Sequence, residues 1–192
     1  MRLNPLPLVL LASLAAACGG PPAVKSVEVL DEKTAITVGA LEQPMPFVET
    51  GIYDLLVPDQ QPSIIYMGPV EWDRSGVYSY LLWIQIAPGV GGHRLDDIRA
   101  LGAVNVTLDD GTVALSALET APAESSPPYQ PVPPVGQTAY FSIDVPLLKR
   151  MAASQRIVLN LRAADLTRID FRPSHATSAA LKQFVIDRGV GD

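Results

Sequence analysis

The chain has 192 residues and is acidic, with 20 Asp and Glu residues against 14 Lys and Arg and a formal net charge of -6. Nucleic-acid binding depends on a basic surface, so this balance argues against a nucleic-acid partner and against electrostatic adhesion to anionic lipid. The single cysteine, Cys18, excludes a disulfide within the chain, so stability must come from packing.

The first 17 residues have the layout of a secretory signal peptide. A positive charge at Arg2 precedes an apolar run over residues 6–14, and alanines at residues 15–17 lead directly to Cys18. The apolar run is shorter than the ~20 residues that a membrane-spanning helix needs. We therefore expect residues 1–17 to be removed, which leaves a mature chain of single-domain size.

The small residues followed at once by Cys18 resemble the lipobox of bacterial lipoproteins, although Ala15 stands where that motif usually has Leu or Val. The resemblance covers only residues 1–18. It implies that Cys18 is acylated and anchors the protein to a membrane of the cell envelope. Gly19, in place of an aspartate, resembles the pattern of lipoproteins sent to the outer membrane, facing the periplasm. The alternative is a plain signal peptide cut after an alanine, which leaves Cys18 unmodified.

Residues 18–26 are predicted to form a flexible tether, because they contain paired glycines and prolines that fit neither a helix nor a ladder. Beyond it, residues 27–189 are predicted to form one β-rich domain. Alternating apolar and polar residues over 27–30 and 34–38 indicate a first hairpin or a bulged strand pair. Prolines punctuate residues 44–62, which favours an irregular or edge strand.

Residues 77–86 give the clearest strand signal in the chain. Almost every residue in this run is apolar or β-favouring, which is typical of a central strand buried on both faces. Residues 63–67 are predicted to be a shorter partner strand. The glycine, proline and polar residues of 68–76 are interpreted as the connection between the two.

A second hairpin is predicted from residues 104–108 and 112–118. Asp109, Asp110 and Gly111 lie between these alternating segments, and a glycine in that place supplies the positive φ that a tight turn needs. The same aspartates could suggest calcium, but the other ligands of a calcium loop are missing.

The proline-rich stretch over residues 122–134 is predicted to be an extended loop or spacer between strands or subdomains. The remaining elements follow from periodicity and capping. They are a strand over 138–145, a short helix from Pro146, strands over 156–162 and 166–171, and a final helix capped by Ser174 and ended by Gly189. The predicted fold class is therefore mainly β (α+β), a β-sandwich-like antiparallel arrangement with two helices in the C-terminal third.

Titratable groups suited to catalysis are few. His93 lies close to Asp96 and Asp97, so these three could form a metal or hydrolytic site, or belong to a solvated loop before a helical turn. His175 fits a surface position at the start of the last helix. The nucleophile and phosphate-loop motifs of known enzyme classes are missing from the sequence, so no catalytic residue, metal or cofactor is predicted.

An aromatic group lies around the predicted central strand. Trp72, Tyr78 and Tyr80 could form an exposed interaction surface, since such rings give large contact area at low entropy cost, or they could belong to the core. A third hypothesis opens the fold around Trp72 and Trp83 to bind a ligand.

Together these features favour a lipid-anchored envelope protein of interaction or assembly type, without enzymatic activity, that binds another envelope protein. The alternatives are a small periplasmic hydrolase or metal-dependent enzyme centred on His93, and a periplasmic ligand-binding module.

Overall fold

The computed structural model describes residues 24–50, 62–87, 103–120, 127–133, 137–162, 168–173 and 177–191. Strands and helices follow one another in the order β1 (Ser26–Asp31), β2 (Ile36–Leu41), β3 (Met45–Glu49), β4 (Ile64–Arg74), β5 (Val77–Ala87), β6 (Ala103–Leu108), β7 (Gly111–Ser116), β8 (Thr138–Ile143), α1 (Val145–Ala153), β9 (Val158–Arg162), β10 (Arg168–Pro173) and α2 (Thr177–Asp187).

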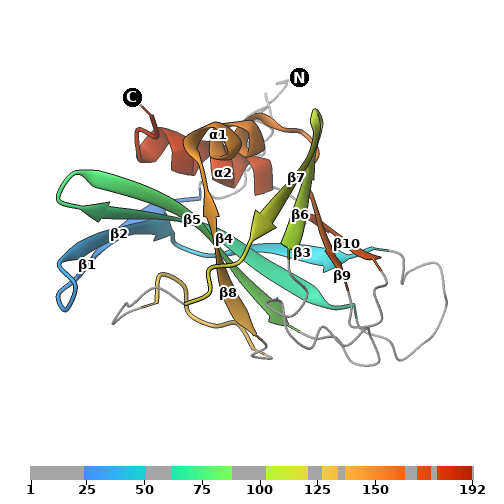
Figure 1. Ribbon diagram of the computed structural model, residues 1–192, viewed down its shortest axis with the longest axis horizontal. Helices are drawn as coiled ribbons and strands as arrows, with labels where there is room; N and C mark the ends of the chain where they lie inside the picture. Colours follow the sequence, from blue (N-terminus) through green and yellow to red (C-terminus); the bar gives the residue numbers. More distant parts are fainter. Residues whose placement is uncertain are drawn as a thin grey trace, which may run out of the picture.

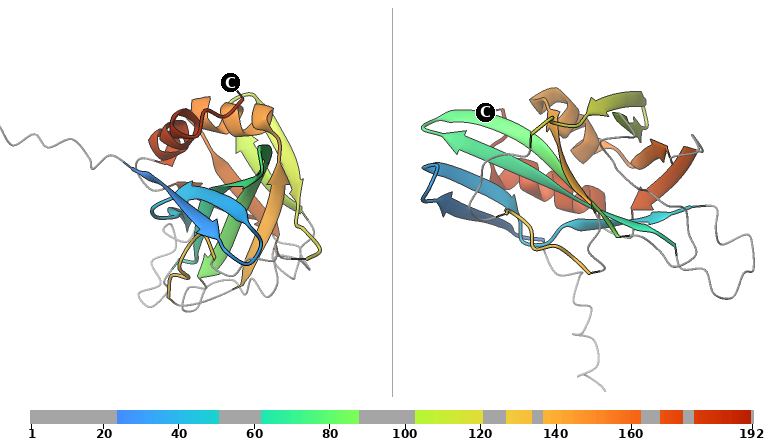
Figure 2. Two further views of the ribbon diagram at one scale, coloured as in Figure 1. Left: turned by 90° about the vertical axis from the view of Figure 1, so that its left-hand side faces the viewer. Right: turned by 60° about the horizontal axis from the view of Figure 1, so that its bottom comes forward.

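All described strands belong to one antiparallel sheet with the order β1-β2-β4-β3-β10-β9-β6-β7, and β5 and β8 continue from the other edge of β4. The sheet curls until β7 and β8 meet, where Ala117 bridges to Phe141 and Leu118 N–H donates to the Tyr140 carbonyl at 2.8 Å. Both helices pack on the side that the sheet curls around, which we call the inner face (Figures 1 and 2).

The predicted fold class is confirmed, because the chain is mainly antiparallel β with two helices in its C-terminal part. Its strands form one continuous curled sheet, and the helices fill the layer that a second sheet would occupy in a sandwich (Figure 2). Alternate residues along each strand point to this inner face, and many of them are buried there.

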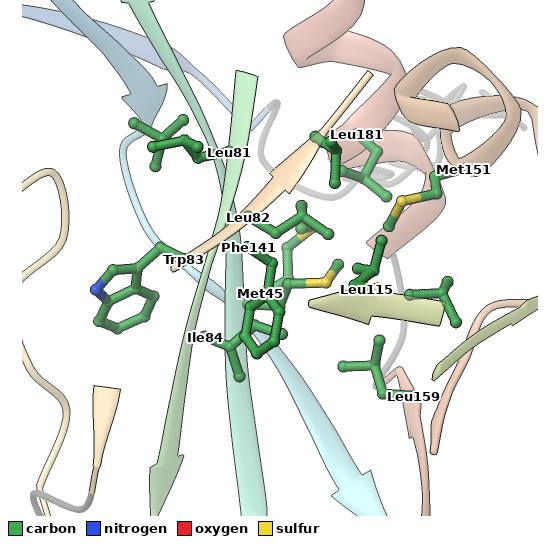
Figure 3. Close-up of a cluster of buried hydrophobic side chains, with 14 of the residues drawn as sticks. Met45, Leu81, Leu82, Trp83, Ile84, Leu115, Phe141, Met151, Leu159 and Leu181 are labelled. Carbon is green, nitrogen blue, oxygen red and sulfur yellow. The ribbon is translucent and has the colours of Figure 1, made fainter. Parts of the chain in front are cut away.

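Buried aliphatic and aromatic side chains fill the inner face. Leu82 and Ile84 of β5 lie with Phe141 of β8, and Met151 of α1 and Leu181 of α2 close the cluster from the helix side (Figure 3). These side chains are almost fully removed from water, and burial of each contributes about 1.5–3 kcal/mol. The core thus holds the helices onto the curled sheet.

The hairpin of β4 and β5 is longer than the sequence indicated. Residues 68–74, interpreted above as a connection, are strand, and that interpretation is wrong. The turn consists of Ser75 and Gly76 alone, with φ of 53° and 86°, and Gly76 N–H donates to Asp73 Oδ1 at 2.6 Å. Two positive φ values give a turn whose twist matches the flanking strands, so the hairpin continues to its tip.

The edge-strand prediction for the proline-punctuated segment is also wrong where the structure describes it, because β3 pairs with both β4 and β10. Pro46 is tolerated there for a geometric reason. Glu49 N–H donates to the Ser63 carbonyl on the β4 side, so the backbone groups of Pro46, three residues earlier, face the β10 side. β10 ends opposite Phe47. The missing N–H of Pro46 therefore falls beyond the end of β10.

The same edge of β4 serves two neighbours, and the sheet forks between them. β3 pairs with Ile64–Met67, and β2 pairs with Val70–Asp73. Gly68 and Pro69 lie in the fork, where neither strand supplies a partner for the Pro69 carbonyl. Tyr129 fills this gap: its hydroxyl donates to the Pro69 carbonyl at 2.7 Å and accepts from Leu41 N–H at 3.1 Å.

Tyr129 belongs to residues 127–133, which we call the strap and which lie on the outer face of the sheet. Its ring stacks on Trp83 with centroids 5.1 Å apart and lies so close to Gly68 that an added Cβ would meet the ring at 2.2 Å. Gln85 fixes the far end by exchanging two 2.9 Å hydrogen bonds with the backbone of Val132. This part of the predicted spacer is therefore a docked part of the fold.

The predicted second hairpin and both helices are confirmed. Asp144 caps α1 by accepting from Leu147 N–H at 2.8 Å, with Pro146 in the first turn. The turn of the hairpin holds the other end of α1, since the Asp109 carboxylate accepts from the backbone N–H groups of Gln155 and Arg156. Hydrogen bonding to α1 thus explains Asp109 without a bound ion.

We predict that Tyr129→Phe lowers the free energy of unfolding by about 2–3 kcal/mol, because Leu41 N–H and the Pro69 carbonyl then remain buried without a partner. Chemical denaturation monitored by tryptophan fluorescence measures this change. Tyr78→Phe is the matched control, since Tyr78 is 55% exposed and its substitution changes stability by less than about 0.5 kcal/mol. Equal stability of the two variants would contradict the role of Tyr129.

Candidate interaction surface

The three aromatic residues singled out from the sequence lie on two faces of the β4–β5 hairpin. Tyr78 and Tyr80 pair with Asp73 and Glu71 and share the inner face, whereas Trp72 lies on the outer face. Tyr78 is exposed, Tyr80 is partly buried, and Trp72 packs against the core. The structure therefore does not bring these three side chains together into one patch.

A row of residues crosses the inner face in register. Glu28 of β1 lies opposite Gly39 of β2, Gly39 opposite Glu71 of β4, and Glu71 opposite Tyr80 of β5. Arg188, the residue after α2, lies across this row. This arrangement was not predicted from the sequence, because residues 68–74 were expected to form a connection; once β4 is known to be a buried strand, Glu71 needs a positive partner.

Arg188 joins the end of α2 to both acidic residues of the row. Its Nε and Nη2 atoms donate to Glu71 Oε1 at 2.9 and 2.5 Å, and Nη1 donates to Glu28 Oε2 at 2.6 Å. Gly39 makes this possible, because a Cβ there would lie 2.7 Å from Arg188 Nε. The guanidinium thus clamps α2 onto β1, β2 and β4.

The clamp contains a largely buried ion pair between Arg188 and Glu71. The side chain of Glu71 is 1% exposed and that of Arg188 14%. Burial alone would lower the pKa of Arg188, but hydrogen bonds to Glu28 and Glu71 outweigh it and raise that pKa. Burial, together with the charge of Glu71, raises the pKa of Tyr80 to about 12. Burial and the negative charge of Glu71 therefore both disfavour the phenolate form of Tyr80.

Exposed apolar side chains gather on β1 and at the start of β5. Val27, Val29 and Leu30 of β1 and Val77 and Tyr78 of β5 are among the large hydrophobic residues that remain exposed. β1 is the first strand in the sheet order, and it pairs only with β2 among the described strands. We call its other side the β1 edge.

Apolar groups flank the β1 edge on both faces. Val27 and Val29 lie on the outer face, where they border a small hollow of about 50 Å³ beside Pro127 and Pro128 of the strap. Leu30, 60% exposed, lies on the inner face. The sequence predicted this strand but not its exposure, since alternation alone does not tell an edge strand from an inner one.

Several residues proposed from the sequence lie outside the described part of the chain: His93, Asp96, Asp97, His175 and Cys18. Within the described ranges, no three His, Cys, Asp or Glu side chains lie close enough together to hold a metal ion. Neither α1 nor α2 is sufficiently long and apolar to cross a membrane.

Comparisons with known proteins give no relative from which a function could be transferred. No family model matches the chain, and no match was found among the curated proteins or the solved structures. The functional argument therefore rests on the residues themselves.

We predict that Arg188→Met lowers the free energy of unfolding by about 3–5 kcal/mol, because it leaves Glu71 buried without a counter-charge. The double variant Arg188→Met/Glu71→Gln recovers part of this loss, since the uncompensated charge is removed. Arg168→Met, which breaks the exposed pair with Asp170, is the control and costs less than about 1 kcal/mol. Thermal or urea unfolding distinguishes the three, and a loss no larger than in the control would refute the clamp.

Proposed function

We propose that the protein is a lipid-anchored component of the bacterial cell envelope that binds a partner protein and has no enzymatic activity of its own. The anchor is the acylated Cys18, supported by the signal-peptide layout and the lipobox-like residues before it. The binding element is the β1 edge. The exposed edge strand with apolar residues on both faces is the observation that carries this proposal.

The backbone of β1 offers hydrogen-bonding groups to an added strand. The Lys25 carbonyl accepts from Glu42 N–H at 2.8 Å, so the backbone groups of the odd-numbered residues of β1 form the hydrogen bonds to β2. Ser26, Glu28 and Leu30 consequently direct their backbone groups toward the β1 edge. An extended segment of a partner pairs with these groups by strand addition.

The side chains of β1 favour such pairing. Protected edge strands usually carry Lys, Pro or an inward-pointing charge; residues 26–31 include neither Lys nor Pro, and their one charge on the inner face, Glu28, is paired with Arg188. Of the acidic residues in β1, Glu28 is held by Arg188 and Asp31 is buried. A partner strand with apolar side chains on both faces would cover Val29 and Leu30 and fill the hollow beside the strap.

The anchor is tested by Cys18→Ser. We expect the native chain to fractionate with membranes and its mature N-terminus to carry acyl chains by mass spectrometry, whereas the variant is released into the soluble fraction. More than one acyl chain is needed for stable anchoring, so the loss should be close to complete. Gly20→Ala is the control and keeps the anchor. An unmodified N-terminus on the native chain would refute the anchor.

The β1 edge is tested by Leu30→Lys, which places a charge on the exposed strand. Burial of one such side chain is worth about 1.5–3 kcal/mol, so partner recovery after cross-linking in intact cells should fall about tenfold or more. Ala114→Lys adds the same charge at another exposed strand position, on β7, and leaves recovery unchanged. Equal recovery with both variants, together with no cross-link from a photoreactive residue at position 30, would contradict strand addition.

A further inference from the structure

α1 and α2 lie side by side and leave an open groove between them, with a volume of about 560 Å³. Apolar side chains form most of it, among them Ala152 of α1 and Val185 and Ile186 of α2. Lys149 and Lys182 border the same groove from the two helices. We call this feature the helix groove.

The charge of the helix groove differs from that of the whole chain, which is acidic. Neither Lys149 nor Lys182 forms a salt bridge with a described residue, and Lys149 makes only a 3.4 Å contact with the Gly191 carbonyl. The nearby arginines are occupied, since Arg150 pairs with Asp110 and Arg188 with the two glutamates of the clamp. The charged side chains that line the groove are therefore both positive, and the carboxylate of Asp187, beyond the lining, accepts hydrogen bonds from Ser26 and Gln183.

Ile186 adds an exposed apolar group to this positive rim. Ile186 is 61% exposed, whereas Leu181 and Phe184 of the same helix are buried in the core. Ile186 and Lys182 are four residues apart on one helix and so lie on the same side of it. A surface that combines apolar side chains with free lysines suits the boundary between acyl chains and anionic headgroups.

The helix groove also lies close to the start of the domain. Ser26 Oγ donates to Asp187 Oδ2 at 2.9 Å, so β1 begins beside the last turn of α2. Ser26 is eight residue steps after Cys18, and a chain of that length spans at most about 28 Å. An acylated Cys18 therefore keeps the end of α2 within that distance of the membrane surface.

We propose that the helix groove contacts anionic phospholipid of the membrane that holds Cys18, and thereby orients the domain with α1 and α2 toward that membrane. This inference rests on the proposed anchor. Two lysines and one exposed isoleucine are too few to hold the protein from solution, but a tether raises their effective concentration at the surface. The acyl chains supply attachment, and the helix groove supplies orientation.

The test uses the acylated full-length protein in vesicles, with Ile186→Cys as its one free thiol and an environment-sensitive fluorophore attached there. We expect the label to shift to the blue and to be quenched by a lipid-linked quencher in vesicles of phosphatidylcholine and phosphatidylglycerol. In phosphatidylcholine alone both effects are weaker. A label at Ser79→Cys, on the outer face of β5, remains in water in both.

The charge contribution is measured with Lys149→Gln/Lys182→Gln. Removal of both lysines should reduce the ratio of lipid-contacting to water-exposed label by about tenfold in the anionic vesicles. Lys33→Gln, at the exposed turn after β1, is the control and has no effect. Loss of the signal in the double variant alone supports the proposal.

Three results would overturn it. If mass spectrometry shows acylated Cys18 and the label at position 186 stays in water on anionic vesicles, the groove proposal fails and the anchor stands. If the label is already shielded in the unacylated Cys18→Ser chain in buffer without lipid or detergent, a second copy of the chain occupies the groove and the lipid proposal fails. If the N-terminus is unmodified, the proposed anchor fails first and the orientation has no basis.

Discussion

The fold depends on the way one edge of β4 serves two strands in succession. Where β2 ends and β3 begins, the sheet would leave a buried carbonyl on Pro69 and a buried N–H on Leu41, and an unmade hydrogen bond at each would cost more than the bond itself is worth. A single hydroxyl, from Tyr129, satisfies both. Burial raises the pKa of that hydroxyl, so it keeps the proton it donates. The proline-rich strap is thus required by the topology of the sheet.

The hairpin of β1 and β2 is held from both sides. Tyr129 secures the end of β2 at the fork, and Arg188 secures Glu28 and Glu71 from the inner face. A residue larger than Gly39 would displace the guanidinium of Arg188. A rigid edge strand loses little conformational freedom when a partner pairs with it, so more of the contact energy appears as affinity. The same two contacts that stabilise the hairpin therefore favour the strand addition that we propose for the β1 edge.

Local signals in the sequence predicted the elements that depend on local chemistry. The capping of α1 by Asp144 and Pro146 and the tight second hairpin are examples. The errors arise where a distant residue supplies what the local sequence lacks. Pro69 indicated a break in the strand, because nothing near it in the sequence shows a partner for its carbonyl. That partner is Tyr129, sixty residues away. The sequence left open whether the aromatic trio forms a surface or belongs to the core, because a two-residue turn and the strand register, which put its members on opposite faces, were not predicted. The clamp could not be found from sequence, since nothing near Glu71 points to Arg188.

The clamp at Arg188 also has a consequence for the order in which the chain can fold. Its partners Glu28 and Glu71 lie 160 and 117 residues earlier in the sequence. Contacts at such separation carry a high loop-closure cost and form after local hairpins. A growing chain emerges from its N-terminus, so β1 is made long before Arg188 can reach it. Until α2 has been made, the hairpin of β1 and β2 lacks its inner clamp, so this hairpin gains its full stability later than the hairpins that close locally.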